Sequence, residues 1–139
     1  MRVRTFEERD TDAVIRLWED CGLTRPWNDP RRDIERKGTT QPELFLVGDD
    51  SGAVVASAMV GYDGHRGWVY YLAVDPSRRG LGHSCALMAE AERLLIERGC
   101  PKIMLMVRAS NTEVVDLYEH LGYAREDTIV MGKRLIADG

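Results

Sequence analysis

One strand, one glycine turn and one helix in the middle of the chain constrain the fold more than any other feature. Val69 to Val74 is apolar or aromatic at every position, which is typical of a central strand covered on both faces. Asp75-Pro76 ends that strand, and a turn with two glycines leads into a long amphipathic stretch from about Gly82 to Arg98. This order predicts an α/β fold in which helices cover the faces of a sheet.

The remaining elements follow from periodicity, caps and turn residues. Asp29 before Pro30 has the form of a helix N-cap with proline at the first helical position. Helices are expected after a cap at Thr11 or Asp12, over Pro30–Lys37 and over Asn111–Leu121, and strands over Val3–Phe6, Leu44–Val47, Ala53–Val60, Lys102–Val107 and Asp127–Leu135. The order β-α-α-β-β-β-α-β-α-β predicts an α/β (α+β) mixed, mostly antiparallel sheet flanked by about four helices. We expect one domain spanning residues 1–139.

Two turns connect the expected antiparallel strands. Asp49 to Gly52 is expected to form one hairpin turn. Asp63-Gly64 predicts a second, two-residue turn of type I′, which needs positive φ at both central residues. That turn would place Tyr62 opposite His65, Met59 opposite Trp68, Ser57 opposite Tyr70 and Ala56 opposite Tyr71.

Composition narrows the classes of partner. The net charge of −4 and the absence of an overall basic balance argue against nucleic acid as the main partner. No apolar run approaches the ~20 residues that span a bilayer, and the N-terminus lacks the apolar region of a signal peptide, so a soluble cytoplasmic protein is expected, with no membrane partner. The three cysteines are widely spaced and form no CxxC, which suits neither a disulfide framework nor a metal site.

The segment "AVDPSRRGLGHSCALM", Ala73 to Met88, carries the strongest functional signal. Where a helix begins after a glycine turn, free N–H groups and the positive end of the helix dipole favour a phosphate or pyrophosphate. The alternative is a turn that needs glycine for geometry alone. The turn is followed by neither GKS nor GKT, and it does not match GxGxxG, which excludes a nucleotide-hydrolysing P-loop and a dinucleotide fingerprint.

With its preceding leucine, this segment resembles motif A of the GNAT superfamily of N-acetyltransferases. The family pattern (Arg or Gln, x, x, Gly, x, Gly or Ala) falls on Arg79, Gly82 and Ser84. "VRASNTEVVDLYEHLGY", Val107 to Tyr123, resembles motif B and is similar to ribosomal-protein N-terminal acetyltransferases. The pieces "RPWNDP", "YDGHRG", "RGCPKI" and "GKRLI" resemble the small bacterial YpeA-type branch. Ser84, Leu81 and His83 depart from the family preference.

The resemblance implies acetyl-CoA as cosubstrate and no metal. The turn would cradle the pyrophosphate with its backbone N–H groups, and the strand before it would pair with the pantetheine arm. The implied cofactor-binding residues are Leu72, Ala73, Val74, Arg79, Gly80, Leu81, Gly82, His83, Ser84, Asn111 and Tyr118. Tyr118 is also the candidate general acid for the departing thiolate, since a phenol has a reference pKa near 10. The alternative for Tyr118 is a core tyrosine.

The general base remains unassigned by the sequence. Where the ribosomal-protein enzymes carry a glutamate, this chain has Met106. Water could relay the proton, or the base could be Asp29, Asp63 or His65. The strand rise places His65, at the hairpin tip, ~15 Å from the expected acetyl position, which favours a turn or rim role for it.

The acceptor side is expected in the loop between the first two helices, with Trp27, Asn28 and Asp29, and at Tyr71 on the strand. The alternative makes Trp27 a hydrophobic plug and Asp29 a helix cap. The leading hypothesis is an acetyl-CoA-dependent N-acetyltransferase acting on a primary amine of a small molecule or of a peptide or protein N-terminus. The alternative is a non-catalytic CoA-binding sensor or interaction module. A homodimer is compatible with the resemblance, which marks no specific interface.

Overall fold

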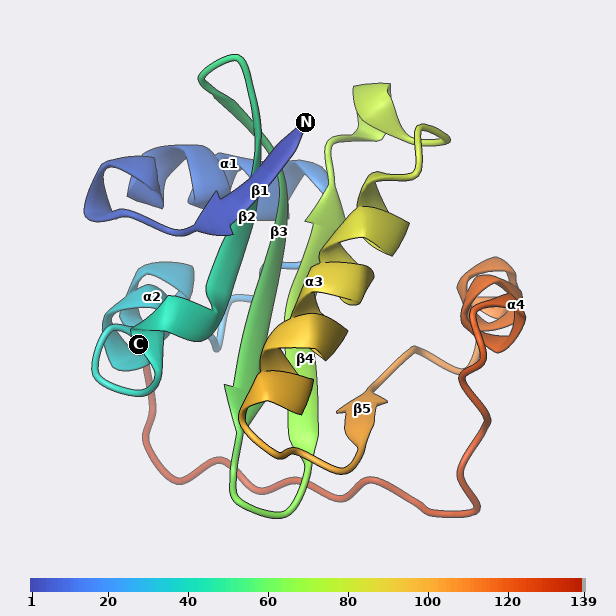
Figure 1. Ribbon diagram of the computed structural model, residues 1–139. Helices are drawn as coiled ribbons and strands as arrows, with labels where there is room; N and C mark the ends of the chain where they lie inside the picture. The colour runs from blue at the N-terminus through green and yellow to red at the C-terminus, as the bar shows by residue number, and fades with distance from the viewer. Residues whose placement is uncertain (139) are drawn as a thin grey trace.

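A five-stranded sheet organises the molecule in a computed structural model that describes residues 1–138 (Figure 1). The strands are β1 (Arg2–Thr5), β2 (Phe45–Asp50), β3 (Ala53–Tyr62), β4 (Gly67–Val74) and β5 (Ile103–Leu105), and the helices are α1 (Thr11–Asp20), α2 (Pro30–Lys37), α3 (His83–Glu97) and α4 (Thr112–His120). The strands lie side by side in sequence order, antiparallel except for the parallel pair of β4 and β5. This confirms the mixed, mostly antiparallel sheet.

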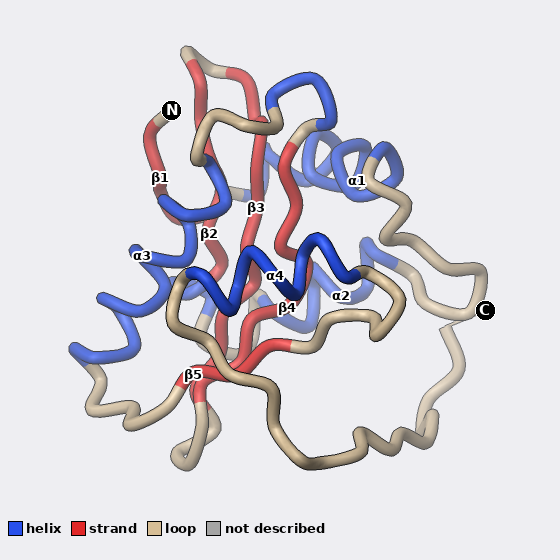
Figure 2. Tube along the Cα trace, turned by 90° about the vertical axis from the view of Figure 1, so that its right-hand side faces the viewer, coloured by secondary structure: helices blue, strands red, loops and turns tan. Residues whose placement is uncertain are grey.

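The two faces of the sheet are covered by different helices. On one face α3 packs its buried side chains, among them Leu87 and Leu95, against the strands. On the opposite face α1 and α2 contribute a second cluster centred on Trp18, which is fully buried. Figure 1 shows α4 set apart from the other helices, on the β5 side of the sheet, and Figure 2, viewed from that side, shows α4 in front of the strands. Within the described residues, no helix is long and apolar enough to cross a bilayer.

The caps define the helix boundaries. The predicted helix α2 has the expected bounds, because the Asp29 side chain accepts a hydrogen bond from the Arg31 N–H at 2.9 Å and Pro30 occupies the first turn. The expected cap of α1 at Thr11 or Asp12 is wrong by one or two residues: Asp10 is the N-cap residue, and its carboxylate pairs with Arg4 at 2.8 and 2.9 Å instead of capping.

The predicted register of the hairpin between β3 and β4 is wrong. Tyr62 lies opposite Gly67 and Met59 opposite Tyr70, each two residues beyond the expected partner, whereas Ser57 lies opposite Ala73 and Ala56 opposite Val74, each three residues beyond it. The two loop residues are Gly64 and His65, since the Asp63 N–H still bonds to the Arg66 carbonyl. The Asp63 carboxylate accepts the N–H groups of His65 and Arg66, and of these loop residues Gly64 alone has positive φ. The turn therefore places glycine first, as in type II′, and Asp63 acts as a side-chain brace.

Strands end where their pairing ends, and this places several strand ends away from the expected positions. The expected turn at Asp49 to Gly52 is shorter, because β2 continues to Asp50 and pairs there with Ala53. The expected strands Val3–Phe6 and Lys102–Val107 are Arg2–Thr5 and Ile103–Leu105.

The expected final strand, Asp127–Leu135, is also wrong, because these residues, all described, form no strand. The chain instead runs as a loop past the hairpin end of the sheet to α2 (Figure 1). There Asp138 is held by Arg36 and Arg134. An apolar stretch forms a strand only where a ladder partner satisfies its backbone, and this route keeps it away from the edge of β5.

Candidate functional site

The two parallel strands separate halfway along β4. Gly67, Trp68 and Val69 pair with β5, which ends at Leu105, whereas β4 continues to Val74. In the described part of the chain, the β4 edge from Tyr70 to Val74 thus has no strand beside it on that side. Leu72, Ala73 and Val74, three of the predicted cofactor-binding residues, lie on this open edge. An open edge presents unpaired backbone groups to which an amide-containing chain can bond.

The glycine turn follows the open edge directly. Asp75 accepts the Ser77 N–H at 2.9 Å and begins a short 3₁₀ turn over Pro76–Arg78. Gly80 and Gly82 then have φ values of +81° and +80°, a conformation that favours glycine, and α3 begins at His83 with no side-chain cap. The first N–H groups of α3 therefore point out of the helix without a side-chain partner. Arg79, Gly80 and Leu81 are exposed, and His83 and Ser84 are partly buried.

The second motif lies beside the open edge. Tyr118 on α4 is 6% exposed and packs in the α3-side cluster, with Leu72 and Val74 among its partly buried members. Its ring meets that of Tyr123 edge-on at 5.6 Å, and burial raises the pKa of Tyr118 to about 12. Asn111 is the exposed N-cap residue of α4, and Met106, after β5, is half exposed and carries no titratable group.

Comparisons with known proteins agree with this arrangement. The family model described as "Acetyltransferase (GNAT) family" matches residues 11–123, most of the chain. The chain belongs to the GNAT family of acetyltransferases. It is 56% identical over 138 residues to a protein named "Acetyltransferase YE1169" from Yersinia enterocolitica, covering 99% of this chain and 98% of that one. It is an acyltransferase.

Solved structures show the same fold. Ard1 from Thermoplasma volcanium is 27% identical, with a TM-score of 0.79 and coverage of 88% of this chain and 82% of that one. A predicted acetyltransferase of Clostridium acetobutylicum, whose structure contains acetyl-CoA, has a TM-score of 0.75 at 15% identity, covering 95% of each chain. These likenesses support a GNAT fold for most of the chain.

A β-bulge in β4 redirects Tyr71 in this GNAT sheet. Ser57 lies opposite Ala73 and Met59 opposite Tyr70, so Tyr71 and Leu72 together oppose the single residue Ala58. Tyr71 has a φ of +51°, a left-handed conformation that is rare for a bulky residue. The extra residue turns its side chain to the α1 and α2 face, where its ring stacks on Trp18 at 3.7 Å.

A buried hydrogen-bond chain supports this bulge. The Trp18 Nε1–H donates to the Ser57 hydroxyl at 2.9 Å, and that hydroxyl donates to the Tyr71 carbonyl at 2.7 Å. Ser57 is fully buried. Residues in rare backbone conformations persist only where their surroundings fix them. We therefore attribute the bulge at Tyr71 to its contacts with Trp18 and Ser57.

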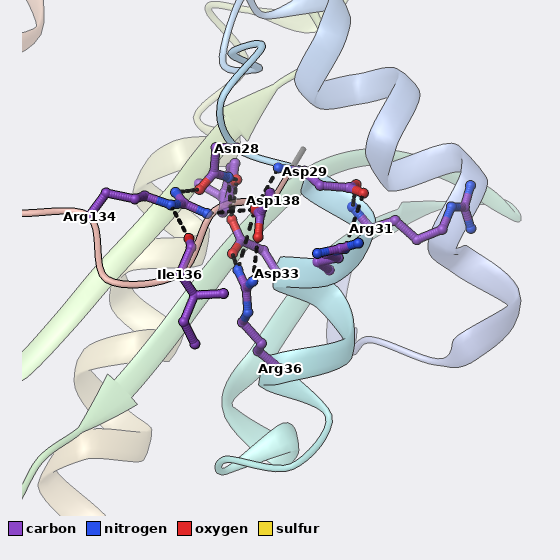
Figure 3. A network of polar contacts seen from close by, with 10 residues as sticks. Asn28, Asp29, Arg31, Asp33, Arg36, Arg134, Ile136 and Asp138 are labelled. Atoms are coloured by element: carbon purple, nitrogen blue, oxygen red, sulfur yellow. Dashed lines mark hydrogen bonds and ion pairs between the residues drawn. The ribbon is translucent and has the colours of Figure 1, made fainter.

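A polar network joins α2, the loop before it and the C-terminal segment (Figure 3). The Tyr71 hydroxyl belongs to this network. It donates to the Asp33 carboxylate at 2.7 Å, and the Asn28 amide donates to the same carboxylate at 2.6 Å. Arg134 donates to the Asn28 side-chain oxygen at 2.7 Å, which ties the loop before α2 to the end of the chain. Burial and the adjacent Asp33 carboxylate raise the pKa of Tyr71 above its ordinary value.

Asp138 anchors the other end of this network. Its carboxylate accepts from Arg36 at 2.5 Å, from Arg134 at 2.7 Å and from the Asp29 N–H at 2.8 Å. These contacts, that of Arg36 first, hold the pKa of Asp138 far below its usual range. The end of the chain is thereby fixed against the α1–α2 loop, beside Asn28.

A cavity of about 590 Å³ opens between α2 and the hairpin half of β3 and β4. The α2 wall is formed by Asp33, Arg36 and Lys37 and the β4 wall by Trp68, Tyr70 and Tyr71. The cavity therefore reaches Tyr71, at the point where the open edge of β4 begins. A cavity of this size suits a small ligand.

The residues expected on the acceptor side are only partly brought together. Asn28 and Tyr71 meet in the network, whereas Trp27 is 65% exposed and does not line the cavity. Asp29 caps α2, in agreement with the alternative reading of that residue. Asp63 lines the cavity, but the His65 and Arg66 N–H groups hold its pKa below its usual range, and His65 is exposed in the loop.

Sequence reasoning missed most of the cavity lining, including Asp33, Lys37, Trp68 and Tyr70. A signal existed in the α2 sequence "PRRDIERK", whose only large apolar residue is Ile34. A helix that packs on a sheet through one apolar residue must bury polar neighbours beside it. Among the described residues, no group of three or more His, Cys, Asp or Glu side chains could hold a metal ion.

Proposed function

We propose that this GNAT acetyltransferase transfers the acetyl group of acetyl-CoA to a primary amine that enters through the α2 cavity. The observation that carries the proposal is the open edge of β4, which leads from the glycine turn to Tyr71 and the cavity mouth. Acetyl-CoA lying along that edge and an amine lying in the cavity would meet at the bulge that contains Tyr71.

The residues present suit acetyl-CoA as cosubstrate. The N–H groups of the Arg79 to Ser84 turn would bind the pyrophosphate, and nothing lies within 4 Å of the position a Cβ would take at Gly80 or Gly82, so the turn is accessible. Leu72, Ala73 and Val74 would bond the pantetheine amides, with Asn111 near the same arm. Acetyl-CoA supplies a thioester, whose carbonyl carbon accepts the amine.

Few groups of the protein would take part in the acetyl transfer itself. A backbone N–H of Leu72 or Ala73 would hold the developing oxyanion. Tyr118 would donate a proton to the thiolate, and burial favours the neutral phenol that carries this proton. Asp29 and Asp63 are occupied with backbone N–H groups, so we assign deprotonation of the amine to water.

Tyr118→Phe tests the assignment of the general acid. Removing a general acid should lower kcat by roughly 10²–10⁴-fold, with the dissociation constant of CoA nearly unchanged. The measurements are thiol release with a panel of amines and calorimetric titration with CoA. Tyr123→Phe is the matched control, because the Tyr123 hydroxyl is buried nearby without a hydrogen-bond partner in residues 1–138.

Three results would contradict parts of this proposal. An unchanged kcat in Tyr118→Phe removes Tyr118 from the mechanism. Binding of CoA without transfer to any amine or peptide favours a sensor, which the methionine at position 106 motivates. No stabilisation by CoA makes the glycine turn purely structural.

A further inference from the structure

Lys37 is a buried cation that faces the cavity. It is the last residue of α2, is 8% exposed and lines the cavity wall. Across residues 1–138 its ammonium group makes no hydrogen bond and no ion pair, whereas the neighbouring Arg36 is paired with Asp33 and Asp138. The charge of the Glu43 carboxylate acts on the pKa of Lys37, but this carboxylate is already paired with Arg98 at 2.9 Å.

The position of this ammonium indicates what it binds. Burial disfavours the charged form and lowers the pKa of Lys37. An anion that enters the cavity would restore the missing partner. Of the two cations on the cavity wall, Lys37 is the one without a carboxylate partner.

The β4 wall of the cavity indicates the chemical nature of the rest of the ligand. Trp68 and Tyr70 stack at 6.3 Å on the strand facing α2, and Tyr71 continues this surface toward the open edge of β4. Aromatic walls bury apolar groups, and few convergent polar groups fix orientation. The ligand should have an apolar body with one anionic group.

We propose that the acceptor is a free amino acid with an apolar side chain, whose carboxylate pairs with Lys37 and whose amine lies toward Tyr71. This inference rests on the proposed acetyl transfer. The Lys37 Nζ lies 3.7 Å from the position that a Cβ would take at Gly61, and Gly61 pairs with Trp68, so the carboxylate would lie beside Trp68 and the amine would point along β4 toward Tyr71. The amine nitrogen forms a bond to the acetyl carbon, the C–S bond breaks, the thiolate takes a proton and the amine proton passes to water.

Paired acceptors test this assignment. Each common amino acid is compared with its amide, which keeps the size and the amine but removes the negative charge. The amide has the more readily deprotonated amine, so chemistry alone favours it. We expect the protein to prefer the acid, with phenylalanine and other apolar amino acids bound best.

Lys37→Met should reverse that preference. Loss of a charge-assisted bond should raise KM for the acid roughly tenfold to a hundredfold, with KM for the amide unchanged. Lys133→Met, an exposed lysine outside the cavity, is the matched control and should leave both values unchanged. Methionine fills similar space without charge, so the melting temperature of Lys37→Met should be equal to or above that of the wild type.

Binding measurements test the role of Lys37 separately from the proposed acetyl transfer. Calorimetry with the CoA-loaded protein measures dissociation constants for acid and amide even if no acetyl transfer occurs. Preferential binding of acids that Lys37→Met abolishes supports the role of Lys37 even when transfer fails. Equal binding of acid and amide, preference for uncharged amines or peptides, or an unaltered ratio in Lys37→Met overturns it.

Discussion

Ser57→Ala should destabilise the protein because this hydroxyl bridges two buried groups. It accepts from the Trp18 indole and donates to the Tyr71 carbonyl, and Ser57 is fully buried. Alanine fits the space but leaves an N–H and a C=O unpaired, each at about 1–3 kcal/mol. We expect a loss of about 2–4 kcal/mol in the free energy of unfolding. For a chain of this length that lowers the melting temperature by roughly 6–16 °C.

Urea unfolding followed by fluorescence measures this loss. A lower midpoint with an unchanged slope indicates a change in stability alone. Ser110→Ala, at an exposed loop residue, should stay within about 0.5 kcal/mol of the wild type. In the Ser57→Ala background, Trp18→Phe should cost less than in the wild type, because the indole donor has already lost its acceptor. A loss below about 0.5 kcal/mol in Ser57→Ala would refute the view that this hydroxyl supports the bulge.

Two further changes test packing and charge. Gly67→Ala should cost about 1–3 kcal/mol by overpacking, because a Cβ there would lie 2.6 Å from Leu95 Cδ1; Gly132→Ala, with nothing within 4 Å, should not. Equal melting temperatures for these two variants would contradict that packing argument. Asp138→Asn should destabilise the protein at neutral pH, because a carboxylate whose folded pKa is depressed stabilises above its unfolded value of 3.8 and loses that effect as pH falls through the folded pKa. Urea unfolding across pH should therefore show a shallower acid decline for Asp138→Asn, and an unchanged decline would show that Asp138 is not held by its ion pairs in solution.

The sequence predicted elements whose signals are local. Helix α2 began and ended as expected because Asp29 and Pro30 set its start through backbone chemistry that no distant residue alters. The glycine turn before α3 was equally visible, since positive φ at Gly80 and Gly82 is a property of single residues. The family resemblance rested on the same local segments.

Features that depend on distant partners were missed. Asp63 bonds the N–H groups ahead of it, which moved the hairpin turn by one residue and changed the register. The bulge at Tyr71 needs Trp18 and Ser57, which lie on other elements, and Lys37 reaches the cavity only because α2 packs on the sheet through Ile34. The segment Asp127–Leu135 has a strand-like pattern, but the ion pairs of Asp138 draw it to α2.

The bulge also has a genetic consequence. Because Tyr71 and Leu72 share one opposing residue, deletion of the Tyr71 codon would leave an uninterrupted ladder from Tyr70 to Val74, with Leu72, Ala73 and Val74 keeping their present partners and faces. No substitution has that effect, since each keeps the extra residue in the strand. Among relatives of this protein, gain or loss of the bulge should therefore appear as a one-residue insertion or deletion in an otherwise unchanged strand.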